Sequence, residues 1–517
     1  MALDPRTPVV VGVGQVTSHP DPGVEPGSRP EPLALMVRAL RAAAEDCDGA
    51  PPGGASPAGD RLLSAAGSLS VVDAFSWPVP NPALLVAEAL GIRPAELLRS
   101  GVGGNSPQSL LHRSAAAIAA GQTDVALVTG ADCVGTRTAA RRRPGHQPVR
   151  WTAQDAAGTP PPVVFGSDRA PATELETARG IRMPLQAYPL LESSLRAARG
   201  WPLDEHRRRI GELWSRFSEV AAGNPYAWLR QPRSAAEIVE PSPMNRMVAF
   251  PYTKLCTANI AVDQGAAYVC CSVAAARAAG VPPERWVFPL AGADAHDHWY
   301  LSERPELHRS PAIRLAGAWA LAAAEVGVDD LGPVDLYSCF PVVVRMAARE
   351  LGLAEDDPGR PLTVTGGLTF AGGPGNNYTS HGIATLVARL RQDPGAAGLA
   401  TGLGWYATKH AVGVYASRPP VHQGRDGFLW GDVQASVDAL PRCPVDPGAS
   451  GPVTVETYTV LYGRDGRPTL GILACRTGTG ARTWANMADQ GVLAELCAVE
   501  GIGRAGDLAP GGSLTLS

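Results

Sequence analysis

Residues 101–132 read GVGGNSPQSLLHRSAAAIAAGQTDVALVTGAD, and this stretch decides the fold. A glycine-rich turn leads into an alanine-rich helix, predicted over residues 108–120, and then into a buried apolar strand, predicted over residues 124–129. Ser106 ends the turn, where free backbone N–H groups and the positive end of the helix dipole would activate a nucleophile. Ser106 followed by Pro107 is also an ordinary helix start. The residues alone leave both interpretations open.

Strands and helices alternate on both sides of this stretch. Before it, PVVVGVGQV at residues 8–16 predicts a strand, and further elements are predicted as a helix over 31–44, a strand over 68–72 and a helix over 82–90. The alternation stops between residues 135 and 245, which are rich in proline and arginine. The sequence therefore predicts an α/β half over residues 1–134 and an inserted loop domain over residues 135–245.

The alternation returns in a second half over residues 246–418, which suggests duplication. Its predicted elements are a helix over 264–278, a strand over 285–290, a helix over 312–325, a strand over 334–337, helices over 342–351 and 378–390, and paired strands near 399–405 and 411–415. From residue 419 the pattern changes to alternating β residues. Residues 453–462 and 469–477, joined by a glycine turn, predict a hairpin in a self-contained β domain over residues 419–517.

Composition excludes several classes of protein. The 517 residues carry a net charge of −4 and only two lysines, Lys254 and Lys409, so we expect no phosphate-binding P-loop and no nucleic-acid partner. The longest apolar runs are too short to span a membrane. The nine cysteines form no C-x-x-C pair, and the N-terminus has no secretory pattern, so we expect reduced thiols and a cytoplasmic location.

Five sequence elements, taken in order, resemble the thiolase superfamily. They are the GVGGNSP turn, VDQGAA at residues 262–267, YSCF at 337–340, GGLTFAGGPG at 366–375 and GLG at 402–404. The resemblance covers about residues 8–416 and is strongest to sterol-carrier-protein-type thiolases and to thiolase-like proteins with an added C-terminal domain. It implies a duplicated, five-layered αβαβα fold with an inserted loop domain, followed by a small antiparallel β-barrel domain.

The same resemblance implies an acetyl-CoA acetyltransferase-like protein of lipid metabolism, with CoA or acyl-CoA as its ligand and no permanently bound cofactor. Thiolases use a nucleophilic cysteine, a histidine that lowers the pKa of that cysteine, and a second cysteine that moves the proton. Here Ser106 and Gly373 replace the first two, and only Cys339 matches the third. Tyr337 replaces a histidine of the oxyanion hole, although its hydroxyl can still donate a hydrogen bond. Ordinary thiolase chemistry is therefore expected to be absent.

Two histidines are candidates for the missing base. His381 follows the polar pair Asn376 and Asn377, and His410 lies in the last strand pair, so we expect both to converge with Ser106 and Cys339 on one pocket. The alternative for each is a structural histidine with its hydrogen bonds satisfied, which is the more common case.

Other charged runs give weaker signals. Arg141, Arg142 and Arg143 are candidates for the CoA phosphates, with a solvated surface as the alternative. No metal site is predicted, because His296 and His298 lack a well-placed third ligand. The alternative to an enzyme that transfers or hydrolyses acyl groups is a non-catalytic module that binds acyl-CoA or regulates a partner. We expect any protein partner to bind through the C-terminal domain.

Overall fold

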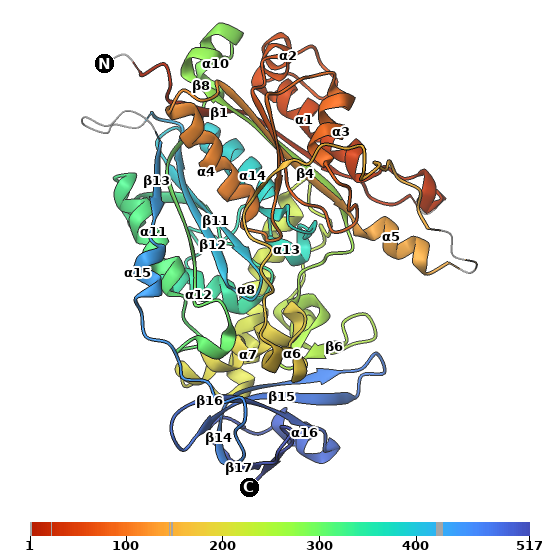
Figure 1. The fold of residues 1–517 in the computed structure, drawn as a ribbon, viewed down its shortest axis with the longest axis vertical. Coiled ribbons are helices and arrows are strands. Elements are labelled where there is room, and N and C mark those ends of the chain that lie inside the picture. The colour runs from red at the N-terminus through yellow and green to blue at the C-terminus, as the bar shows by residue number, and fades with distance from the viewer. Residues whose placement is uncertain (1–2, 22, 144, 146–147, 420–427) are drawn as a thin grey trace.

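The computed structural model describes residues 3–21, 23–143, 145, 148–419 and 428–517. Figure 1 shows two sheets with their helices at one end of the molecule, a helical region in the middle and a third sheet at the opposite end. None of the helices in these ranges is long and apolar enough to cross a membrane.

The first sheet has six strands, and its central strands are buried throughout. Its order is β1 (Pro8–Thr17), β8 (Asp263–Ser272), β4 (Val125–Cys133), β2 (Ser68–Val71), β3 (Glu96–Ser100) and β5 (Val163–Phe165). The surrounding helices are α1 (Pro32–Cys47), α2 (Pro57–Ser64), α3 (Pro82–Leu90) and α10 (Val273–Ala279). A Cβ atom on Gly12 or Gly14 would collide with the α1 backbone, so these glycines let α1 approach β1 closely.

The second sheet has five strands and shares two helices with the first. Its order is β10 (Leu331–Asp335), β11 (Ala397–Gly404), β12 (Lys409–Ala416), β9 (Phe288–His296) and β13 (Leu429–Asp432). Its outer helices are α11 (Pro311–Ala323), α12 (Pro341–Leu351) and α15 (Gln434–Asp438). Helices α4 (Ser106–Ala119) and α14 (Tyr378–Gln392) contact both sheets. The predicted five-layered αβαβα fold is confirmed.

The helix predicted over residues 264–278 is wrong. The chain forms strand β8 over Asp263–Ser272, and only the last six residues of the predicted range belong to a helix, α10 (Val273–Ala279). All ten residues of β8 are buried because it lies between β1 and β4. A strand covered on both faces loses the alternation that distinguishes strand from helix, and its alanines favoured the wrong assignment.

The inserted region is mainly helical. It contains α5 (Val134–Arg141), α6 (Glu174–Ala178), α7 (Pro184–Ala198), α8 (Leu203–Gly223) and α9 (Ala235–Val239). Its one strand in the core, β5, pairs with β3 and extends the first sheet. Helix α7 packs against α12 on one side and against the C-terminal sheet on the other.

The C-terminal sheet is antiparallel and contains the predicted hairpin. Its order is β16 (Arg482–Met487), β15 (Pro468–Thr477), β14 (Gly451–Tyr462), β17 (Ala505–Leu508) and β18 (Leu514–Leu516), and α16 (Gln490–Leu496) packs on β15. The Asn486 N–H donates to the Gly512 carbonyl at 2.7 Å, which brings the two edges of the sheet together.

This sheet is not self-contained, in contrast to the prediction. Strand β6 (Met247–Ala249) pairs with β14, and β7 (Tyr252–Thr253) pairs with β6. Conversely, β13 pairs with β9, so residues after 419 still belong to the second core sheet. Turn chemistry marks where the hairpin lies, but pairing between distant segments decides which strands share a sheet.

Candidate functional site

A cavity of about 630 Å³ lies where the glycine-rich turns, the end of β10 and the start of α7 meet. Its walls are largely apolar. The lining residues are Phe75, Val102, Gly103, Gly104, Arg182, Met183, Pro184, Leu185, Tyr188, Thr257, Ala258, Ile260, Tyr337, Cys339, Phe340, Leu368, Gly373, Gly375, Asn376, Leu403, Trp405 and Tyr406. Phe75, Met183 and Ile260 are 49%, 59% and 53% exposed, so they mark its rim. Residues from both halves and from the inserted region therefore form one pocket.

Ser106 does not line this cavity. Its Oγ donates to the Gly101 carbonyl at 2.9 Å, and the residue is 6% exposed. Helix α4 begins at Ser106, followed by Pro107 in the first turn. In this geometry the hydroxyl closes the turn before the helix.

Cys339 and Tyr337 do line the cavity, just after β10 ends. Burial raises the pKa of the Cys339 thiol to about 12, and a hydrogen bond with Tyr188 offsets only part of this effect. Burial also raises the pKa of Tyr337 well above its ordinary value. Both groups are therefore protonated at neutral pH and can act there as hydrogen-bond donors.

His381 is buried on α14, away from the cavity surface. Its Nδ1 lies 2.9 Å from Gln15 Oε1, and its Nε2 has no partner among the described residues. Burial lowers the pKa of His381 to about 3.

His410 lies on β12 and is also absent from the cavity lining. Its Nε2 lies 3.1 Å from Asp297 Oδ2, 3.3 Å from Ser310 Oγ and 3.2 Å from the Ala407 carbonyl oxygen. The predicted convergence of four residues is thus not found, because only Cys339 of the four reaches the cavity.

The two asparagines hold the glycine turns together. Asn376 lines the cavity, accepts a hydrogen bond from the Gly103 N–H at 2.9 Å and donates to the Asp73 carbonyl at 2.8 Å. Asn377 lies behind it and donates to the Gly130 carbonyl at 2.6 Å. Gly373 lines the cavity without a side chain, so it supplies no acid or base.

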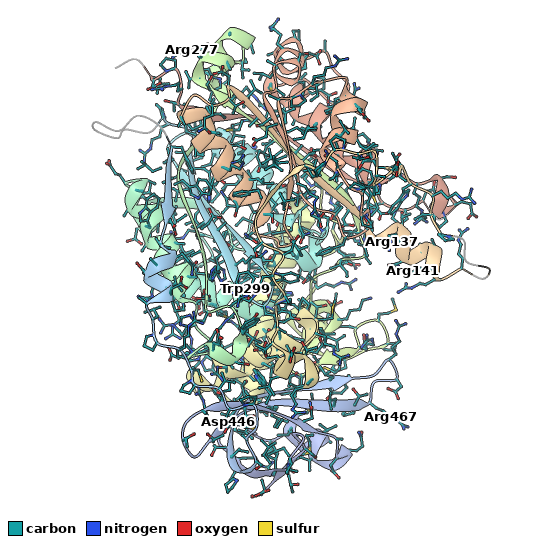
Figure 2. All side chains as sticks on the ribbon, viewed as in Figure 1. Arg137, Arg141, Arg277, Trp299, Asp446 and Arg467 are labelled. Carbon is teal, nitrogen blue, oxygen red and sulfur yellow. The ribbon has the colours of Figure 1, made fainter. Side chains whose placement is uncertain are left out.

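The candidate phosphate ligands lie elsewhere. Arg141 is the last residue of α5, and Figure 2 shows it at the edge of the molecule. Arg142 and Arg143 follow it, Arg143 pairs with Glu25, and none of the three lines the cavity. Within the described ranges, no group of three or more His, Cys, Asp or Glu side chains could hold a metal.

Sequence reasoning missed the turn between β11 and β12. Trp405 and Ala407 have positive backbone φ angles of 58° and 51°, which are uncommon for residues other than glycine. The Tyr188 hydroxyl donates to the Trp405 carbonyl at 2.6 Å and accepts from the Ala407 N–H at 3.1 Å. Tyr188 therefore holds this turn against the cavity. No motif signals this, because Tyr188 comes from the distant helix α7.

Lys409 was also missed as a neighbour of the site. Its Nζ donates to the carbonyls of Val102 and Ser167, and it lies 5.6 Å from the centre of the Trp405 ring. Burial lowers the pKa of Lys409 to about 8. It supports the Val102–Gly103 turn from behind the cavity. Because successive residues of a strand point to opposite faces, Lys409 and His410 lie on different sides of the sheet.

Comparison with known proteins shows similarity to a thiolase-like family model and to solved structures. Residues 432–513 match the family model described as the thiolase-like protein type 1 additional C-terminal domain. The crystal structure of a monomeric SCP2-thiolase-like protein type 1 from Mycobacterium smegmatis is 33% identical, with 100% of both chains covered and a TM-score of 0.82. None of the curated proteins matches the chain.

Two more distant structures share the fold of the core. The Ltp2-ChsH2(DUF35) aldolase is 19% identical over 81% of this chain and 100% of that chain, with a TM-score of 0.59. The dimeric peroxisomal thiolase of Saccharomyces cerevisiae is 14% identical over 81% of this chain and 99% of that chain, with a TM-score of 0.55.

Proposed function

This chain belongs to the SCP2-thiolase-like protein type 1 family, and we propose that it binds an acyl-CoA or related thioester without carrying out ordinary thiolase acyl transfer. One observation carries the proposal: the cavity has largely apolar walls, and its described lining holds no carboxylate, no imidazole and only one thiol, Cys339, whose pKa is raised by burial. Its volume lies in the range of small-molecule pockets, and its walls are mostly aliphatic and aromatic.

The protonation states of the lining residues support this proposal. Among the described residues, the titratable side chains of the lining are Arg182, Tyr188, Tyr337, Cys339 and Tyr406. Burial raises the pKa of the thiol and of all three tyrosines. No carboxylate or imidazole belongs to the lining. The cavity can therefore donate hydrogen bonds to a thioester carbonyl, but it has no group that readily accepts a proton at neutral pH.

The CoA portion of such a ligand would extend outward past Arg182. This guanidinium lies in the lining beside the exposed Met183, at the rim. Arginine matches phosphate geometry, so Arg182 is a better candidate for a phosphate contact than Arg141, Arg142 and Arg143, which lie elsewhere.

The second candidate function is acyl transfer or thioester hydrolysis by a route that does not use Ser106. The presence of Cys339 in the cavity favours it, because a bound ligand could change the surroundings of the thiol. Against it stand the high pKa of Cys339 and the lack of a base in the lining. The geometry therefore favours a non-catalytic module that binds acyl-CoA or regulates a partner.

A protein partner and a place in cytoplasmic lipid metabolism complete the proposal. The likeness to the Ltp2-ChsH2(DUF35) aldolase, whose name joins two components, supports a partner. The C-terminal sheet, which adds a surface at one end of the molecule, is the proposed place for it (Figure 1).

A panel of acyl-CoAs of increasing chain length tests the proposal by calorimetry and intact-mass measurement. We expect saturable binding that strengthens with chain length, and no covalent mass increase. Ala258→Trp fills the cavity and should abolish binding, whereas Ala278→Trp, on the exposed surface of α10, is the matched control. A covalent acyl adduct would favour the enzymatic alternative, and equal binding by both variants would refute the assigned site.

A further inference from the structure

A second cavity, of about 360 Å³, lies between α8 of the inserted region and α12 of the second half. It is separate from the acyl cavity. Pro184, the first residue of α7, lines the acyl cavity, and Arg199, just after its last residue, lines this one. A helix rises 1.5 Å per residue, so roughly 22 Å of helix separates the two ends. An inference about this cavity therefore goes beyond the proposed function and does not depend on it.

Arginines dominate the walls of this cavity. Arg209 and Arg216 lie seven residues apart on α8, and Arg345 and Arg349 lie four residues apart on α12, so each pair shares one face of its helix. With Arg199, five guanidinium groups face three acidic side chains in the lining: Glu212, Glu355 and Asp356. The lining thus has an excess of positive charge.

Trp201 fixes three of these guanidinium groups. The groups of Arg199, Arg209 and Arg345 lie 5.4, 4.6 and 5.6 Å from the centre of its ring. These distances are those of cation–π contacts. The Arg345 side chain is only 3% exposed, so a charged group is held in a fixed place inside the protein.

Three of the arginines already have carboxylate partners. Arg199 Nη2 lies 2.5 Å from Glu355 Oε1, and Arg209 Nε lies 2.6 Å from Glu205 Oε1. Arg345 is 3.4 Å from Glu192 and 3.5 Å from Glu355. Glu355 is therefore shared between two arginines.

Arg216 and Arg349 lack such partners. Arg216 Nη2 donates to the backbone carbonyl of Glu355 at 3.0 Å, and no ion pair is formed by its guanidinium within the described ranges. The Arg349 side chain is exposed, and it forms no hydrogen bond or ion pair with the described part of the chain. Two guanidinium groups from two helices thus line the cavity without an ion-pair partner within the described ranges, and the exposed carboxylate of Asp356 lies in the same lining.

We propose that this cavity binds a compact, multiply charged phosphate compound, which Arg216 and Arg349 hold from two helices. Guanidinium groups present parallel N–H donors that match phosphate oxygens in pairs. A ligand with two linked phosphates would pair with both free arginines at once. The remaining volume accommodates a small organic group.

Calorimetry on the full chain with pyrophosphate and with ADP, in magnesium-free buffer, tests this site. We expect saturable binding of at least one of them, and at least a tenfold increase in Kd for Arg216→Gln and for Arg349→Gln. Arg464→Gln removes the same charge from an exposed turn and should change Kd less than twofold. Binding of ADP but not pyrophosphate would identify a nucleotide, and binding of both would identify the linked phosphates as the recognised group.

Three results would overturn the proposal. They are the absence of saturable binding, equal weakening by Arg464→Gln, and citrate binding as tightly as either phosphate, since citrate would indicate a polycarboxylate site. Ala258→Trp should leave phosphate binding unchanged, so failure of the acyl cavity and failure of this site remain distinguishable. Unchanged melting temperatures of the glutamine variants would show that a loss of binding is not a loss of folding.

Discussion

The Ser106 hydroxyl donates to the carbonyl of Gly101, 2.9 Å away, and so closes the turn that precedes α4. In thiolases a nucleophilic cysteine occupies this helix start, as the resemblance implies. Here the residue at that position is buried and hydrogen-bonded, and the cavity wall beside it is formed by Gly103 and Gly104. Ser106 therefore supports the turn, and the wall of the cavity begins beside it at Gly103 and Gly104.

Ser106→Cys should therefore not produce a thiolase. A thiol at this position would have no histidine beside it, because Gly373 stands where the family has one, and residues that act as a unit fail together. We expect no CoA-dependent cleavage of acetoacetyl-CoA by either the unmodified chain or Ser106→Cys. Robust cleavage by the unmodified chain would refute the proposed function, and cleavage by the variant alone would show that the turn can release this side chain.

Cys339 should react slowly with alkylating reagents. A pKa of about 12 in place of 9 lowers the thiolate fraction at neutral pH by roughly 10³-fold. Iodoacetamide labelling, followed by peptide mass mapping, should show a Cys339 rate that rises about tenfold per pH unit between pH 7 and 9. A bound acyl-CoA should suppress the labelling. Fast labelling at pH 7 would mean that the thiol is activated and would favour the enzymatic alternative.

His381 should make the protein less stable in mild acid. Its pKa is about 3 in the folded chain and about 6.5 when unfolded, so below pH 6.5 the unfolded chain binds the extra proton and folding is penalised. The free energy of unfolding is therefore highest above pH 6.5, where His381 is neutral in both states, and it falls as the pH decreases toward 3. The loss between pH 7 and pH 5 is about 2 kcal/mol.

The His381→Gln variant isolates this effect. Denaturant unfolding at pH 5 and pH 7 should show a smaller pH difference for the variant than for the unmodified chain. An unchanged difference would assign the acid sensitivity to other groups. Because His381 does not line the acyl cavity, ligand affinity at pH 7 should change little.

Two tyrosines of the cavity provide a matched test of the turn between β11 and β12. Tyr188→Phe removes both hydrogen bonds to that turn and leaves the Trp405 carbonyl and the Ala407 N–H without this partner, which costs about 1–3 kcal/mol. We expect a lower melting temperature and weaker acyl-CoA binding. The Tyr406 hydroxyl is buried without a partner among the described residues, so Tyr406→Phe should be neutral or stabilising. Similar losses in both variants would contradict the holding role of Tyr188.

The sequence predicts the layers and part of the site, and the rest depends on contacts between distant segments. Cys339 and Tyr337 line the cavity because they follow the end of β10, while their chemical roles stay predictions. His410 was misplaced because strand alternation sends it to the face opposite Lys409. The arginine cavity had no sequence signal, since its residues come from two segments that are far apart in the chain, one running from Arg199 into α8 and the other from α12 to Asp356. Strand β8 was misread because burial on both faces removed its periodicity.

The buried guanidinium of Arg482 should decide whether the C-terminal sheet stays docked. It is fully buried, donates to the carbonyls of Leu301, Ser302 and Arg304, and pairs with Glu456 at 2.6 Å. Arg482→Met would leave three carbonyls and part of a buried carboxylate unpaired, a loss of about 3–5 kcal/mol. Arg504→Met, which removes an ion pair with the part-exposed Glu495, should cost less than about 1 kcal/mol. Thermal melts of both variants compare these costs.

Since Leu301–Arg304 belongs to the second half, the Arg482→Met melt should also show an early transition of the C-terminal sheet. Equal melts for the two variants would mean that the pairing of β6 with β14, and not Arg482, holds the sheet in place.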